Sequence, residues 1–137
     1  MYEQPKTVPR RRGIAHTSAH SGGDHHSSRG AQLAGHLAAL LAATESVRAA
    51  TSDPGQRAGL DAALDQLLTR LAELMSTEVR RPVAARTGAL TPAELHQRAL
   101  ALAGRVLVVA AAQQDTATAM LACRRMDAHT AALKLLA

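Results

Sequence analysis

Residues 53–82, DPGQRAGLDAALDQLLTRLAELMSTEVRRP, decide the fold class. Asp53 is a good N-cap for a helix, and Pro54 sits at the first helical position, where its missing N–H costs nothing. Arg80 and Arg81 suit the negative end of the helix dipole, and Pro82 cannot continue the helix. Between these ends, leucines recur every three or four residues, which is the spacing of one helical face, at positions 60, 64, 67, 68, 71 and 74. We therefore predict a helix over residues 54–80.

The same reasoning predicts a helix on each side of this stretch. Before it, apolar residues and one threonine share a helical face over residues 30–50, at Leu33, Leu37, Leu40, Thr44 and Val47. After it comes the most specific local signal of the chain, Thr91-Pro92-Ala93-Glu94. Thr91 can accept from the amide of Glu94 while Glu94 reaches back to the amide of Thr91, which is a capping box. A helix is therefore predicted over residues 92–112.

The last helix is predicted over residues 116–136. Gln113-Gln114-Asp115 has the composition of a tight turn, and Asp115 can cap the helix that follows. The inner face of this helix is expected at Met120, Ala122 or Cys123, Met126, Leu133 and Leu136, and His129 is in register with it. A single helix over residues 92–136 is the alternative, which we disfavour because it would far exceed the usual helix length.

The composition agrees with an all-helical protein. Of the 137 residues, 31 are Ala, Phe and Trp are absent, and Tyr2 is the one aromatic residue. Ala is the best helix former, whereas strands favour aromatic and β-branched residues. We predict one domain over residues 30–137, an all-α, up-down four-helix bundle with alternating helix directions, whose links are short apart from a loop over residues 81–91.

Residues 1–29 are predicted to be a disordered, basic and histidine-rich tail. This segment has no apolar periodicity and contains the triplet Arg10, Arg11 and Arg12 and the glycine pair at 22–23. Four tail histidines are candidates for Zn, Ni or Cu ligands, namely His16, His20, His25 and His26. Since flexible glycines do not position ligands, we interpret the tail as solvated and expect no metal and no cofactor.

No catalytic motif is found in the bundle sequence. A P-loop, a dinucleotide-binding glycine fingerprint, a nucleophile elbow and zinc-ligand spacings are all absent, so we expect a non-enzymatic protein. No Glu precedes His36, His96 or His129 by three residues, and these histidines are therefore interpreted as partly buried or surface residues. Cys123 is interpreted as a small core residue, and Gly104 as a point of close backbone approach.

Two functions are compatible with these features. The broad apolar stripes of the 54–80 and 92–112 helices favour protein–protein interaction, through a homo-oligomer or another helical protein. The alternative is a DNA-binding regulator in which residues 84–100 form a helix-turn-helix-like segment. In that case His96, Gln97 and Arg98 would face the DNA groove, and the residues 10–12 would contact phosphates. Two features argue against a DNA-binding segment. Pro82 leaves room for only a very short first helix, and the proposed recognition helix continues into an apolar stretch that must be buried.

The sequence predicts a cytoplasmic protein that does not enter the membrane. One cysteine fits a reducing compartment, and residues 13–17 do not form the apolar core of a secretory signal. The most apolar stretch, residues 99–112, contains Arg105 and is shorter than the roughly 20 residues that span a bilayer.

Overall fold

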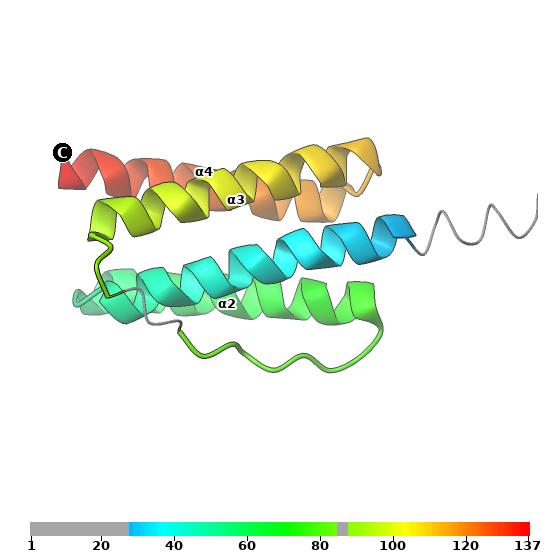
Figure 1. Ribbon diagram of the computed structural model, residues 1–137, viewed down its shortest axis with the longest axis horizontal. Helices are drawn as coiled ribbons and strands as arrows, with labels where there is room; N and C mark the ends of the chain where they lie inside the picture. The colour runs from blue at the N-terminus through cyan, green and yellow to red at the C-terminus, as the bar shows by residue number, and fades with distance from the viewer. Residues whose placement is uncertain (1–27, 85–87) are drawn as a thin grey trace, which may run out of the picture.

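The computed structural model describes residues 28–84 and 88–137, which contain four helices and no strand. The described part of the first helix covers residues 28–50, so its first two residues belong to the segment predicted as tail. It is followed by α2 (Pro54–Met75), α3 (Pro92–Ala112) and α4 (Thr116–Leu136) (Figure 1). The predicted all-α, four-helix fold is confirmed. The predicted disorder and metal ligands of residues 1–27 lie outside the described residues.

The predicted helix starts are confirmed by their hydrogen bonds. The carboxylate of Asp53 accepts from the amide of Gln56 at 2.8 Å. Thr91 and Glu94 form the reciprocal capping box, with distances of 3.2 and 2.8 Å. The chain breaks between α3 and α4 at Gln114, which has a positive φ of 58°, so residues 92–136 are two helices and not one.

α2 ends earlier than predicted, since the sequence predicted a helix that continues to residue 80. The helix stops at Met75, because Ser76 adopts a left-handed conformation with φ 53°. The amide of Thr77 then donates to the carbonyl of Ala72 at 3.2 Å, which closes the helix end. Arg80 and Arg81 therefore lie beyond the helix and do not act on its dipole.

The chain order of helix directions is up, down, down, up, and not the expected alternation (Figure 1). After α2 the chain runs back along the bundle through residues 76–84, which we call the return segment, and α3 then starts at the same end as α2. Because the backbones of α2 and α3 do not approach each other closely among the described residues, the two helices lie on a diagonal, and helices that are neighbours in space remain antiparallel.

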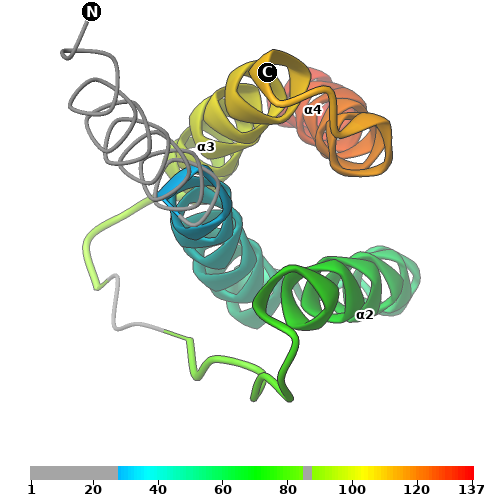
Figure 2. The same ribbon diagram turned by 90° about the vertical axis from the view of Figure 1, so that its right-hand side faces the viewer.

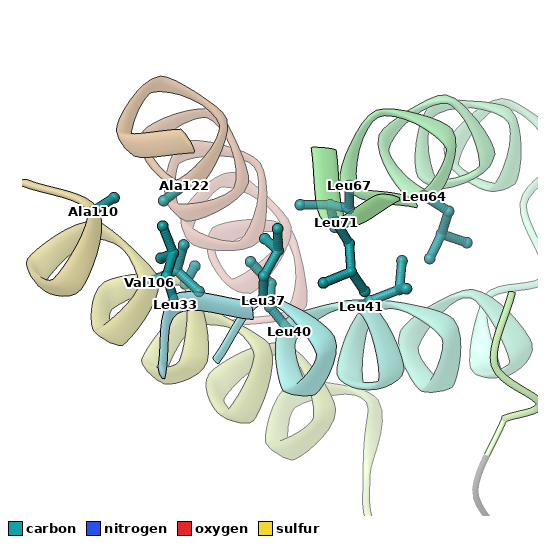
Figure 3. Packing of buried hydrophobic residues seen from close by; sticks show 11 residues of the cluster. Leu33, Leu37, Leu40, Leu41, Leu64, Leu67, Leu71, Val106, Ala110 and Ala122 are labelled. Atoms are coloured by element: carbon teal, nitrogen blue, oxygen red, sulfur yellow. The ribbon is translucent and has the colours of Figure 1, made fainter. Parts of the chain in front are cut away.

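The core is built from leucines of the first helix and α2 and from small residues of α3 and α4. Leu37 and Leu40 are completely buried in it, as are Val106 and Ala122 (Figure 3). Ala103 of α3 is also completely buried. Small side chains let α3 and α4 approach closely, and these two helices pack against each other far more extensively than α2 and α4 do. The bundle therefore has one loosely packed side, between α2 and α4 (Figure 2).

By length and composition α3 could cross a membrane, with a mean hydropathy of 1.2 over its most apolar window, of which 28% is buried. Leu95, Ala99 and Val106 of this helix face the protein core, while Arg98 and Arg105 are exposed. Since a core helix passes the same test, this finding alone does not indicate a membrane protein.

Candidate functional site

Two histidines from different helices meet at one end of the bundle. His96 lies near the start of α3 and His129 lies near the end of α4, and their Nδ1 atoms are 3.0 Å apart. Since neutral imidazole carries one N–H, one ring donates this hydrogen bond and the other accepts it. His129 is 1% exposed and His96 is half-buried.

Arg125 belongs to the same cluster because it precedes His129 by one helical turn on α4. Its Nη1 is buried and has no hydrogen-bond partner. The Nε2 of His129 is also buried without a partner. Two polar nitrogens are thus withdrawn from water and left unpaired, although most buried polar groups in proteins are hydrogen-bonded.

Burial governs the electrostatics of this cluster. Burial, followed by the positive charge of Arg125 and the nearby His96, lowers the pKa of His129 to about 4. Burial also lowers the pKa of His96 and that of Arg125. Both imidazoles are therefore neutral near pH 7, whereas Arg125 keeps its charge because arginine remains protonated in proteins.

The cluster lines a hollow of about 250 Å³, which we call the His–Arg hollow. α2 contributes Gln56, Gly59 and Leu60 to its wall, and the remaining lining is alanine and leucine from α4. A Cβ added at Gly59 would meet no atom within 4 Å, so this glycine leaves space open at the hollow. The site therefore combines a few polar nitrogens with a mostly apolar wall, which is typical of small-molecule sites.

The donor set favours a ligand that accepts hydrogen bonds over a metal ion. Among residues 28–84 and 88–137, no three His, Cys, Asp or Glu side chains are grouped so as to hold a metal. The guanidinium of Arg125 beside the two imidazoles would also repel a cation. An oxygen with lone pairs could instead accept from Arg125 and from an Nε2–H of His129.

A second hollow of about 570 Å³ lies along the loosely packed side, between residues 65–73 of α2 and 117–124 of α4. Arg70 is among its lining residues and donates to Asp115 and to Thr118, each at 2.8 Å, and so links α2 to the start of α4. Its α2 side is polar, through residues such as Asp65 and Glu73, which explains why apolar packing does not close this side.

The predicted DNA-contacting residues are separated by the structure. Gln97 and Arg98 are exposed on α3, but His96 turns inward to His129. Residues 78–84 and 90–91 are not helical, and residues 88–89 form a turn, so no helix precedes α3 within the described part of the 84–100 segment. The residues 10–12 lie outside the described part of the chain, and nucleic-acid contact stays a prediction.

Several expectations for single residues are wrong. Met120 and Leu136 were expected on the inner face of the last helix, but each is 51% exposed. Cys123 is exposed, because Ala122 occupies the buried position of that helical turn. Gly104 makes no close approach, since a Cβ built there meets nothing within 4 Å.

Sequence reasoning missed the site itself. The spacing of Arg125 and His129 was the one local signal, since residues four apart share a helical face. Nothing in the sequence pairs His129 with His96, which lies 33 residues earlier in the chain. His36, the third bundle histidine, lies on the first helix and does not line the hollow.

Comparison with known proteins adds no further constraint on this site. No protein-family model matches the chain, and neither the search of curated proteins nor that of solved structures found a match. The fold and the site define an all-helical bundle with a mostly apolar hollow at one end, to which His96, Arg125 and His129 add polar groups.

Proposed function

We propose that this protein is a non-enzymatic binding protein whose His–Arg hollow holds a small ligand that accepts hydrogen bonds. The observation that carries the proposal is a pair of buried, unpartnered nitrogens, Nη1 of Arg125 and Nε2 of His129, on two residues that line the same hollow. A bound ligand would give both nitrogens the partner that the protein does not supply.

The energetics support this proposal. Leaving a buried polar group without a partner costs about 1–3 kcal/mol, and more if the group is charged. A side chain that serves only the fold would be replaced by an apolar one at little cost. A ligand that accepts hydrogen bonds from both groups offsets this free-energy cost in the bound state. In the free state the rest of the fold is stable enough to bear the cost. The hollow lies just below the usual range of roughly 300–1,000 Å³, which indicates a small ligand.

The stability of the ligand-free protein tests the proposal. Arg125→Met keeps the aliphatic stem and removes the unpaired guanidinium, so we expect the free energy of unfolding to rise by about 1 kcal/mol. The matched control is Arg124→Met, one residue away and exposed, which should change stability by less than about 0.5 kcal/mol. Denaturant unfolding measures both. A clear loss of stability in Arg125→Met would assign the guanidinium a structural role and remove the proposal.

Self-association is a second candidate, favoured by apolar side chains that remain exposed. Met120 is 51% exposed beside the loosely packed α2–α4 side, Val108 on α3 is 69% exposed, and Leu135 on α4 is 78% exposed. A second copy covering the α2–α4 side would bury Met120 and Leu121. This candidate agrees with the homo-oligomer expected from the broad stripes.

Sedimentation velocity of the full chain tests self-association. We expect a dimer whose fraction falls in Met120→Arg and is unchanged in Val83→Arg, a control in the return segment at 93% exposure. Sedimentation as a monomer at about 1 mM chain would limit the association free energy to less than about 4 kcal/mol and contradict the candidate.

We also propose a cytoplasmic location, because the free thiol of Cys123 is exposed and suits a reducing compartment.

A further inference from the structure

We propose that the ligand of the His–Arg hollow is a small monocarboxylate with a short apolar body, held by its carboxylate between Arg125 and His129. This inference rests on the proposed binding function and adds the chemical class of the ligand. Its three parts are the charge of the ligand, the hydrogen bonds to its head group and the nature of its body.

The charge follows from the groups that line the hollow. Arg125 is the one charged side chain among the described lining residues near pH 7, since burial keeps His96 and His129 neutral. From α2 the lining is Gln56, Gly59 and Leu60, none of which titrates. The adjoining hollow shares Gln56 and His96 with this one and holds one carboxylate, that of Asp53, which accepts from the amide of Gln56 as the cap of α2. Asp61, next to Leu60, is paired with arginines. The single positive charge among the lining residues, that of Arg125, therefore favours a ligand with a single negative charge.

The head group follows from the hydrogen bonds that are missing. When His96 donates its Nδ1–H to the Nδ1 of His129, the proton of His129 lies on Nε2. This Nε2–H and the Nη1–H of Arg125 then both need an acceptor. A carboxylate has two acceptor oxygens and no donor, and so it can satisfy both groups at once.

The body follows from the rest of the wall, which is apolar. Gly59 and Leu60 of α2 face alanines 128, 131 and 132 and Leu135 of α4. A phosphate dianion would bury a second charge against this wall without a counter-charge, which is costly. An aliphatic or small aromatic body would displace water from the wall at a gain. The ligand therefore has an ionised head and an apolar remainder that fits about 250 Å³.

Titration of the full chain with hexanoate tests this assignment, with hexanamide and inorganic phosphate as comparison probes. Calorimetry gives the affinity, and NMR of the imidazole nitrogens reports on His129. We expect one hexanoate per chain, a shift of the Nε2 resonance of His129, and binding at least about tenfold weaker for hexanamide. We expect no binding of phosphate at the same concentrations.

Two variants and a control locate the binding. Arg125→Met should lower the affinity for hexanoate by at least about tenfold. Gly59→Leu should abolish binding because its side chain fills the hollow, where a Cβ meets no atom within 4 Å. Gly104→Leu introduces the same side chain in open space away from the hollow and should bind hexanoate like the natural protein.

Each other outcome has a defined meaning. Equal affinity for hexanamide and hexanoate, or binding of phosphate with a shift of His129, would overturn the carboxylate class and leave the binding function standing. Hexanoate binding that survives Gly59→Leu would place the ligand elsewhere and overturn the assignment. If no probe shifts His129, the carboxylate class is overturned. The binding function then falls only if Arg125→Met also destabilises the free protein.

Discussion

Arg81 of the return segment forms an ion pair with Glu45 of the first helix, with Nε and Oε2 2.7 Å apart. The same guanidinium contacts Asp61 of α2 through Nη2 at 2.8 Å, and Arg48 also pairs with Asp61. Two arginines and two carboxylates thus tie the return segment to the hairpin of the first helix and α2. This network holds the chain along its path back to the end where α3 begins.

Removing Arg81 should loosen the return segment. We expect Arg81→Leu to lower the free energy of unfolding by about 1 kcal/mol or less, because the pairs are partly exposed. It should also speed proteolytic cleavage within the return segment, measured by limited digestion and mass spectrometry. The matched control, Arg80→Leu, removes an exposed neighbour that forms no ion pair within the described residues. Equal cleavage rates in the two variants would contradict the role given to Arg81.

Arg70 should matter more than Arg81, because its partners are more buried. Asp115 has a side chain 13% exposed, and Thr118 is fully buried. Burial opposes the ionisation of Asp115, yet the hydrogen bonds from Arg70 and Thr118 hold the pKa of this carboxyl below its ordinary value. Arg70→Leu leaves that charge without its cation, and we expect a loss of about 2–3 kcal/mol. Arg57→Leu, at an exposed α2 position, is the control for denaturant unfolding, and a similar loss in both would argue against the link between α2 and α4.

Leu37 should be among the most sensitive core positions. Its side chain is 0% exposed and packs with leucines of α2 and small residues of α3 and α4. Leu37→Ala leaves a cavity that close-packed helices refill only in part, so we expect a loss of about 2–5 kcal/mol. Val83→Ala removes apolar atoms at a position that is 93% exposed and should cost little. Thermal and denaturant unfolding compare the two, and a loss below about 1 kcal/mol for Leu37→Ala would mean that the core is not packed as described.

Acid should destabilise the protein through His129. Burial, followed by Arg125 and His96, holds the pKa of His129 at about 4 in the folded protein, against 6.5 for the ordinary residue. The unfolded chain therefore binds the proton first. Stability is fully present above pH 6.5 and falls as the pH drops toward 4, by about 3 kcal/mol. Asp61 and Asp115 contribute mainly below this window, because their pKa values lie below 3.8.

The variant His129→Gln tests this pH dependence. It removes the titrating group, so the decline of stability between pH 6.5 and 4 should become much shallower, although His96 contributes in the same direction. His36→Gln removes a histidine that does not line the hollow and serves as the control. Denaturant unfolding at several pH values measures the slope. An unchanged slope in His129→Gln would show that other groups govern the acid sensitivity.

The helices could be predicted from the sequence because their signals are local. Asp53 and Thr91 satisfy amides three residues ahead of them, so their capping roles are visible in short stretches of sequence. The leucine spacing of the first helix likewise marks its buried face before any partner helix is known. The end of α2 was less predictable, because a left-handed serine rather than Pro82 terminates it.

The tertiary structure decided everything that depends on which helices are neighbours. The return segment places α2 and α3 on a diagonal, and the path of that segment is set by contacts of Arg81 with residues 20 and 36 positions away. The rotational orientation of α4 in the bundle buries Ala122 and exposes Cys123. No local sequence signal distinguishes these two residues. The same packing brings His129 to His96. Helix formation is a property of neighbouring residues, whereas a site between helices depends on how their faces pack, and many sequences with the same periodicity could pack differently.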